Sequence, residues 1–135
     1  INTAVEVDVY GHTNSSHVRG SQLLQGIGGS GDFARNSLLS MMVLPSTAQD
    51  GDISRIVPMA SHVDHPDHDV DVVVTEHGVA DLRGLTPDER FEELVDECAH
   101  PDFRTDLRRY GERAAEDGGH MPHDLPSAFD MHRVE

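Results

Sequence analysis

The stretch DVVVTEHGV, residues 71–79, constrains the fold of this chain more than any other feature. Its three consecutive valines are β-branched and place apolar groups on both faces of an extended backbone. Strands buried on both faces occur almost only in parallel sheets that are covered by helices. Helical patterns are mixed with strand patterns along the rest of the chain. We therefore expect an α/β domain with a largely parallel sheet and flanking helices.

Three further segments have the patterns of strands. Residues 3–9 alternate apolar and polar side chains, and residues 40–46 form a short apolar run. Residues 53–61 alternate as well, but Pro58 lacks the N–H group that a central strand needs. The pattern therefore predicts an edge strand for this last segment.

Helical patterns cover three segments: residues 32–41, 86–99 and 100–117. The second begins with a strong start signal, because Thr86 is a good N-cap, Pro87 suits the first helical position, and Glu89 completes a capping box. For the third helix the expected cap is His100 or Asp102. With a length of 135 residues, these elements fit one domain.

The charge of the chain excludes several classes of partner. There are 25 acidic residues against 10 basic ones, all of them arginine, for a net charge of −15. Such a surface repels nucleic acid and anionic membranes. It indicates either an acidic face for a protein partner or adaptation to molar salt, which shortens the Debye length to about 3 Å and screens the repulsion. Because the acids are spread along the chain and lysine is absent, we favour the halophilic interpretation.

The chain has neither a signal-peptide pattern nor an apolar run long enough to span a bilayer, so we expect a cytoplasmic protein. Its single cysteine, Cys98, lies in a helical stretch and is expected to be a small buried thiol. The opening INTAVEVDV enters a strand at once and lacks an initial Met. We therefore expect a further segment upstream of residue 1.

Four glycines punctuate the stretch GIGGSGDF, residues 26–33, directly before an expected helix. A glycine loop there offers free backbone N–H groups, which attract a phosphate, a carboxylate or a developing oxyanion. Neither the P-loop nor the dinucleotide-binding spacing is present. Asp32 either caps the helix or lies in its first turn. The alternative is a tight turn with close helix packing.

The segment SHVDHPDHDV places His62, His65 and His68 at intervals of three among several aspartates. Imidazole and carboxylate groups suit zinc or another transition metal. However, Pro66 breaks any helix, so the three rings need not share a face. The alternative is a loop whose histidines form local hydrogen bonds. A small metal-binding or interaction module is thus the alternative function of this chain.

Two other pairs of polar residues are candidates. Glu76 and His77 follow the valine-rich strand at its carboxyl end, where open α/β sheets bind ligands. Glu76 is either such a site residue or an ion-pair partner of Arg83. His120 and His123, in GHMPH, are expected to line a surface turn.

Several motifs occur together and in order. They are EVDVYGHTNSSHVRG, GIGGSGDFARN, DGDISRIVPMASHVDHPDHDVDVVVTEHGVADLRG and ECAHPDFR. Over residues 2–125 the chain resembles the C-terminal domain of the acetyl-CoA hydrolase/transferase family. That family includes succinyl-CoA:acetate and 4-hydroxybutyrate CoA-transferases of class I, whose domains have a NagB/RpiA-like fold. The resemblance and the charge together indicate a haloarchaeal source.

The resemblance implies a mechanism of covalent catalysis. In this family two similar α/β domains form the subunit, and a glutamate attacks the acyl-CoA thioester. An anhydride and then a glutamyl-CoA thioester follow, and the final acceptor is an acid or water. The matching glutamate lies upstream of residue 1, so residues 1–135 are expected to be one domain, the C-terminal half, that holds no catalytic nucleophile. The isolated chain is then expected to be inactive.

The resemblance also implies which residues approach coenzyme A, the substrate. Gly28 and Gly29 would form the loop beside the thioester and its oxyanion. The residues implied to bind CoA are Gln25, Gly28, Gly29, Ser30, Gly31 and Gln49. Gln49 stands where the family has a lysine, which weakens the electrostatic hold on the CoA phosphates. Glu76 matches a TEQG-like position but not the nucleophile, and no metal is expected.

The implied partners are an acyl-CoA, a small carboxylate and the N-terminal domain, supplied in cis or in trans. A homodimer is expected as well. The residues leave two points open: the acyl group that is handled, and whether the acceptor is water or an acid. A purely structural chain that pairs through an uncovered apolar face is a third possibility.

Overall fold

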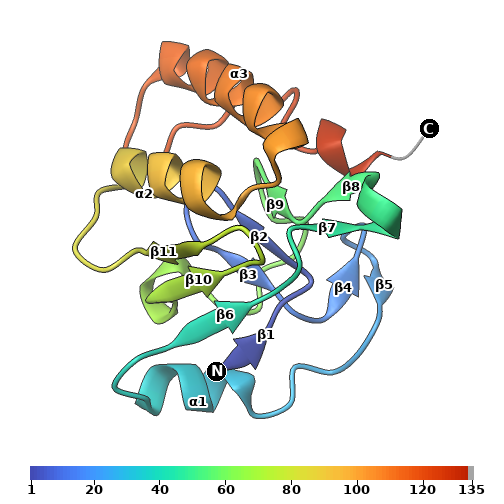
Figure 1. The fold of residues 1–135 in the computed structure, drawn as a ribbon, viewed down its shortest axis with the longest axis vertical. Helices are drawn as coiled ribbons and strands as arrows, with labels where there is room; N and C mark the ends of the chain where they lie inside the picture. The colour runs from blue at the N-terminus through green and yellow to red at the C-terminus, as the bar shows by residue number, and fades with distance from the viewer. Residues whose placement is uncertain (134–135) are drawn as a thin grey trace.

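The computed structural model of the chain describes residues 1–133 (Figure 1). Its larger sheet has the strand order β1-β6-β10-β11. The strands are β1 (Asn2–Thr3), β6 (Met41–Val43), β10 (Val72–Val74) and β11 (Val79–Asp81). β1, β6 and β10 run parallel to one another, and only β11 is antiparallel, in a hairpin with β10. The predicted α/β class is confirmed, with parallel pairing dominant in this sheet.

A smaller sheet of order β3-β2-β9 lies behind the first. Its strands are β2 (Glu6–Asp8), β3 (Thr13–Asn14) and β9 (Ile56–Val57), with β2–β9 parallel and β2–β3 antiparallel. Two hairpins complete the strands: β4 (His17–Val18) with β5 (Gln22–Leu23), and β7 (Thr47–Ala48) with β8 (Ile53–Ser54). The single edge strand expected over residues 53–61 is wrong in extent, because the segment divides into β8 and β9 in different sheets; β9 is an edge strand and ends just before Pro58.

The main helices lie at two ends of the molecule. They are α1 (Ser30–Asn36), α2 (Pro87–Glu93) and α3 (Pro101–Asp117). A π-helical turn, η3 (Leu94–Cys98), continues α2, and short 3₁₀ turns are η1 (Gln49–Gly51), η2 (Asp67–Asp69) and η4 (Asp130–His132). Figure 1 shows α2 and α3 side by side at one end and α1 at the other. Within residues 1–133, no helix has the length and apolar character to cross a membrane.

The core lies between the larger sheet and the α2–η3 segment. Val73 is fully buried in β10, the strand between β6 and β11, as three successive valines predicted. From η3, Leu94 and Cys98 pack into the same cluster without exposed surface. Cys98 is therefore a buried thiol, and burial raises its pKa to about 11. The strand itself is shorter than expected, because the chain turns at Thr75 and Gly78 instead of continuing to residue 79.

Two other predicted elements are wrong in extent. Residues 3–9 form two strands in different sheets, because the chain leaves β1 at Ala4 and enters the smaller sheet at Glu6. The helix expected over 32–41 spans Ser30–Asn36 only. Leu38 is fully exposed and finds no core contact that would favour another helical turn.

The predicted helix starts are confirmed where the sequence signal was strongest. The Thr86 hydroxyl accepts the N–H of Glu89, and the Glu89 carboxylate accepts the N–H of Thr86, which is a complete capping box. At α3, His100 is the cap rather than Asp102, because its Nδ1 accepts the N–H of Asp102 at 3.2 Å. Asp32 lies in the first turn of α1 and does not cap it.

Candidate functional site

The glycine loop, defined here as residues 24–29, connects β5 to α1 across an open surface (Figure 1). Every residue from 21 to 29 is exposed. A β-carbon added to Gly26 or Gly28 would meet no atom within 4 Å. Gly28 has a φ of +60°, a backbone conformation that favours glycine. The close helix packing that would explain a glycine run without a ligand is therefore absent at Gly26 and Gly28.

The backbone amides of this stretch have no protein acceptors. Among residues 1–133, no N–H group of residues 26–31 donates to a backbone or side-chain oxygen. The N-cap position of α1 is Gly29, which has no side chain to accept these donors. Because the loop is exposed, water or a ligand must satisfy them. An array of free donors can hold a carbonyl oxygen that becomes negative during a reaction.

Ser30 connects the glycine loop to a buried imidazole. Its hydroxyl lies 2.9 Å from the carbonyl oxygen of Ile27 and 3.1 Å from Nε2 of His65. His65 has no exposed surface, and burial lowers its pKa. In the sequence, the GIGGSGDF stretch and the histidine segment are separate candidate sites. The fold brings them into contact.

The two glutamines expected to bind CoA lie in different places. Gln25 belongs to the glycine loop, where its Nε2 donates to the carbonyl of Ser15 at 3.0 Å. Gln49 lies in the turn between β7 and β8, exposed and with a φ of +49°. Figure 1 shows this hairpin apart from α1. The structure thus brings together Gln25 and residues 28–31 but not Gln49.

An apolar surface surrounds the loop. It is defined here as the loop surface and consists of Leu23, Leu24, Ile27, Phe33 and Leu38, which are 43–103% exposed. No residue from 20 to 31 is charged, although the chain has a net charge of −15. Exposed apolar side chains beside an uncharged loop are unusual on so acidic a protein and are typical of an interaction site.

The three histidines of the segment SHVDHPDH do not share a site. His62 Nε2 lies 3.2 Å from Asp64, His65 contacts Ser30, and the His68 side chain is 87% exposed. Within the described residues, no group of three or more His, Cys, Asp or Glu side chains could hold a metal ion. The local hydrogen-bonding interpretation fits this segment.

Asp64 is the centre of that local network. Its carboxylate accepts the N–H of Ser15 at 2.8 Å and the hydroxyl of Ser16 at 2.6 Å. Burial opposes ionisation of Asp64, but these hydrogen bonds outweigh it and lower its pKa. The network joins the β3–β4 turn to the segment that carries His65, so it fixes the base on which the glycine loop rests.

Glu76 has an internal partner other than the one that we considered. Its carboxylate accepts the N–H of Ser46 at 2.8 Å and the Ser46 hydroxyl at 2.5 Å. Burial raises its pKa, but the two bonds from Ser46 outweigh that effect and lower it. Of the two alternatives for Glu76, the pairing with Arg83 is wrong, because Arg83 forms its ion pair with Asp81 at 2.7 Å.

The two histidines of GHMPH also differ from each other. His120 is exposed, as expected for a surface turn. His123 instead packs inward: its Nδ1 lies 2.7 Å from the Tyr110 hydroxyl, and its ring lies edge-on against Tyr10. Burial lowers the pKa of His123.

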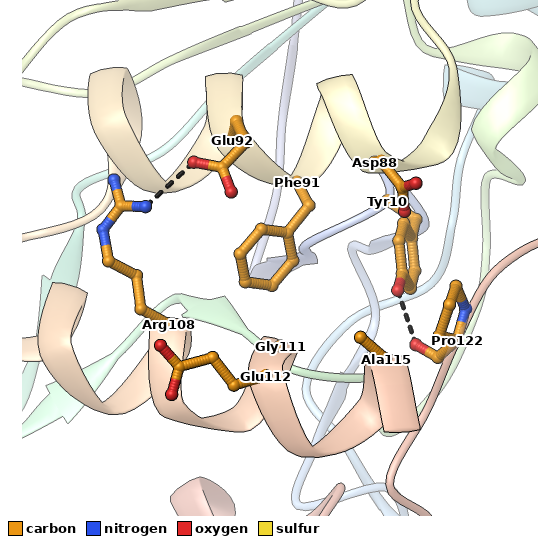
Figure 2. A pocket seen from close by; sticks show the side chains of 9 residues that line it. All are labelled: Tyr10, Asp88, Phe91, Glu92, Arg108, Gly111, Glu112, Ala115 and Pro122. Atoms are coloured by element: carbon orange, nitrogen blue, oxygen red, sulfur yellow. Dashed lines mark hydrogen bonds and ion pairs between the residues drawn. The ribbon is translucent and has the colours of Figure 1, made fainter. Parts of the chain in front are cut away.

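Apart from the glycine loop, the molecule has a hollow between α2 and α3 (Figure 2). Its volume is about 360 Å³, and Phe91 and Tyr10 form its apolar base. Glu92 and Arg108 bridge its rim with an ion pair at 2.8 Å. The sequence could not reveal this hollow, since it exists only because two helices meet. Its rim also carries the carboxylates of Asp88 and Glu112, so the hollow is acidic, whereas the glycine loop is uncharged.

A family model described as the acetyl-CoA hydrolase/transferase C-terminal domain matches residues 1–111. This chain belongs to that family. It is similar to the propanoyl-CoA:succinate CoA transferase of Escherichia coli, with 55% identity over 133 residues, and to the acetyl-CoA hydrolase of Saccharomyces cerevisiae, with 50% over 141. Each alignment covers 98% of this chain and 27% of the relative. The chain therefore spans about a quarter of the length of these curated relatives.

Solved structures agree with this membership. RipA from Yersinia pestis has a TM-score of 0.75 with 36% identity, over 83% of this chain and 26% of that one. The 4-hydroxybutyrate CoA-transferase from Porphyromonas gingivalis has a TM-score of 0.65 with 38% identity, over 83% and 25%. The CoA-transferase-like α/β fold and the resemblance inferred from the motifs are thus confirmed.

The two parts of the site differ in whether the sequence could predict them. Glycine spacing alone left a ligand loop and a tight turn as alternatives, and the resemblance over several motifs favoured the ligand loop. The contact between Ser30 and His65 spans 35 positions of sequence and had no local signal. It forms where α1 packs against η2, the short turn that follows His65.

Proposed function

We propose that this domain forms the CoA-binding half of an acetyl-CoA hydrolase or an acyl-CoA:carboxylate CoA-transferase. One observation supports it most: the backbone amides of residues 26–31 have no acceptor in the described part of the chain and line an exposed, uncharged loop. Gly28 and Gly29 are the donors beside the thioester. Gln25, Ser30 and Gly31 approach the rest of CoA, and Gln49 approaches its phosphates.

The proposed chemistry needs a carboxylate from outside these residues. A glutamate of the N-terminal domain attacks the thioester carbonyl, and the negative charge on its oxygen is held by the amides of Gly28 and Gly29. The CoA thiolate leaves and an acyl–glutamyl anhydride remains. The thiolate then attacks the glutamyl carbonyl, which releases the carboxylate product and forms glutamyl-CoA. A second carboxylate then attacks glutamyl-CoA and takes the CoA by the same steps in reverse, or water hydrolyses the glutamyl-CoA thioester. The isolated domain catalyses neither reaction.

The N-terminal domain, in cis or in trans, is the proposed occupant of the loop surface. This surface is apolar and adjacent to the free amides of an uncharged loop, so a domain that covers it also encloses the thioester away from water. Enclosure strengthens the hydrogen bonds to the oxyanion. A homodimer of the complete subunit is part of the same proposal.

We also propose that the protein works in a cytoplasm of high salt, in a halophilic and haloarchaeal cell. The support is the net charge of −15 and the absence of lysine. Molar salt would screen the repulsion between exposed acids. The melting temperature should therefore rise between low and molar KCl, and equal values would contradict this part of the proposal.

The substitution Gly26→Ala tests the proposed CoA site. A methyl group at Gly26 meets no atom within 4 Å, so the fold should tolerate it. We expect an unchanged melting temperature but smaller CoA-induced shifts of the amide resonances of residues 26–31, because the methyl group occupies space needed by the ligand. Thr105→Ala, an exposed change on α3, is the matched control.

Three outcomes would contradict the proposal. CoA could shift amides around the hollow between α2 and α3 and leave residues 26–31 unmoved. The Gly26→Ala variant could bind CoA as well as the unaltered chain. Finally, formation of glutamyl-CoA by the isolated 135-residue chain would contradict its dependence on an N-terminal domain.

A further inference from the structure

His65 lies beneath the glycine loop on a rigid base. Its backbone N–H donates to the carbonyl of Thr13 at 3.0 Å, and its own carbonyl accepts the N–H of Thr13 at 2.9 Å. Thr13 belongs to β3, and neither residue has exposed surface. The imidazole therefore has a fixed position relative to the smaller sheet.

The glycine loop has few other attachments to the molecule. At its start, the N–H groups of Leu24 and Gln25 donate to the carbonyl of Ser16 at 2.8 and 3.3 Å, and the Gln25 side chain donates to the carbonyl of Ser15. After Gln25, the first hydrogen bonds within residues 1–133 that tie the loop to the rest of the domain run from Ile27 through Ser30 to His65. The conformation of the free amides thus depends on the contact between Ser30 and His65.

Counting donors assigns the direction of these bonds. The Ser30 hydroxyl has one hydrogen, and the carbonyl of Ile27 can only accept it. Ser30 Oγ must then accept from His65 Nε2, which places the ring hydrogen on Nε2. This tautomer also explains the buried Nδ1 of His65, which has no partner. Unprotonated, Nδ1 leaves only a lone pair without a partner, whereas the other tautomer would bury an unpaired N–H group.

We propose that His65 is a positioning residue for the glycine loop. It acts through a hydrogen-bond relay, in which His65 Nε2–H donates to the Ser30 hydroxyl and this hydroxyl donates to the carbonyl of Ile27. The relay fixes the peptide at Ile27 and with it the direction of the amides at Gly28 and Gly29. His65 does not touch the substrate itself. This inference rests on the proposed CoA function and adds to it the group that orients the loop.

The test uses three substitutions in the 135-residue chain. His65→Leu removes the donor, Ser30→Ala removes the hydroxyl, and His65→Gln keeps an N–H donor near the position of Nε2. His68→Gln is the matched control, because this neighbouring ring is 87% exposed and does not contact the loop. The readouts are the amide resonances of residues 26–29 without ligand, the imidazole nitrogen shifts of His65, and the affinity for CoA.

We expect His65→Leu and Ser30→Ala to shift the loop amides without ligand and to weaken CoA binding by about 3- to 10-fold, the range for one lost hydrogen bond. The double variant should bind no more weakly than either single variant, because both changes break the same relay. His65→Gln should restore most of the affinity. A purely structural role would instead make the two losses multiply.

The inference is overturned if Ser30→Ala leaves the loop amides and the affinity unchanged, or if the His65 hydrogen is found on Nδ1. Should His65→Leu fail to fold, Ser30→Ala still decides, since this residue is only partly buried. If the unaltered chain shows no CoA response while Ser30→Ala still moves the loop amides, the CoA function fails and the positioning of the loop stands.

Discussion

α2 begins with a complete capping box, whereas α1 begins at Gly29 with no side-chain cap. The first turn of any helix leaves backbone donors without partners. At α2, Thr86 and Glu89 satisfy two of these donors, and Pro87 removes a third. At α1 the donors stay free beside an exposed loop. The difference separates a helix start that serves folding from one whose donors are available to a ligand.

The apolar side chains of the two regions differ in the same way. Leu94, in the turn that continues α2, has no exposed surface, whereas Leu38 after α1 is 103% exposed. Burial of a leucine stabilises the fold by about 1.5–3 kcal/mol, but an exposed leucine contributes nothing of that kind. The α2 region therefore buries its apolar side chains inside the domain, whereas the α1 region leaves them exposed, as the proposed contact with the N-terminal domain requires.

The largest effect should come from the buried side of this comparison. Leu94→Ala leaves a cavity between η3 and the larger sheet and should lower the free energy of unfolding by about 2–5 kcal/mol. Denaturant titration at molar KCl measures it. A loss below about 1 kcal/mol would mean that the contacts of η3 do not hold the core.

A satisfied buried carboxylate contrasts with the unsatisfied loop amides. Glu6 accepts hydrogen bonds from His132, Ser61 and Asn14. Burial disfavours its charge, but these bonds outweigh burial and lower its pKa below the ordinary value of 4.5. Its contribution to stability is therefore present above pH 4.5 and is lost as the pH falls through the lowered pKa.

Glu6→Gln tests that contribution. The variant should be less stable at pH 7 by about 1–3 kcal/mol, because the amide nitrogen cannot accept the surrounding donors. Its stability should also fall less steeply between pH 5 and pH 3 than that of the unaltered chain, on the order of one titrating group. Glu116→Gln, an exposed change, is the control. If the stability of both variants fell equally with pH, Glu6 would not be the group that stabilises the fold above its pKa.

A smaller effect is expected at the capped helix start. Thr86→Ala should lower the free energy of unfolding by about 1 kcal/mol, because it removes the acceptor for the N–H of Glu89. Thr86→Ser should restore most of it. Thermal denaturation of the two variants side by side measures the difference, and equal melting temperatures would show that the capping box adds no stability.

The smallest effect on stability should come from Leu38→Ala. This change is chemically identical to Leu94→Ala, but the exposed side chain should alter the free energy of unfolding by no more than about 0.5 kcal/mol. Its effect should appear instead in the association with the N-terminal domain, measured by calorimetry. Unfolding at a much lower denaturant concentration would place Leu38 in the core and remove the contrast between the two regions.

Local signals in the sequence determined a large part of the fold and of the candidate site. The three valines predicted a central buried strand, Thr86 and Glu89 predicted a helix start, and Pro58 predicted an edge. The glycine spacing predicted an open loop before a helix. Each of these depends on backbone geometry or on hydrogen bonds between residues a few positions apart, so the sequence window contains its cause.

Only the tertiary structure decided which distant groups meet. It divided residues 3–9 between two sheets. It also paired Glu76 with Ser46, Arg83 with Asp81, and His65 with Ser30. It also ended α1 before Leu38 and left that side chain outside. Such choices depend on contacts between residues tens of positions apart and on the burial that they create. A pattern of neighbouring residues contains no measure of either.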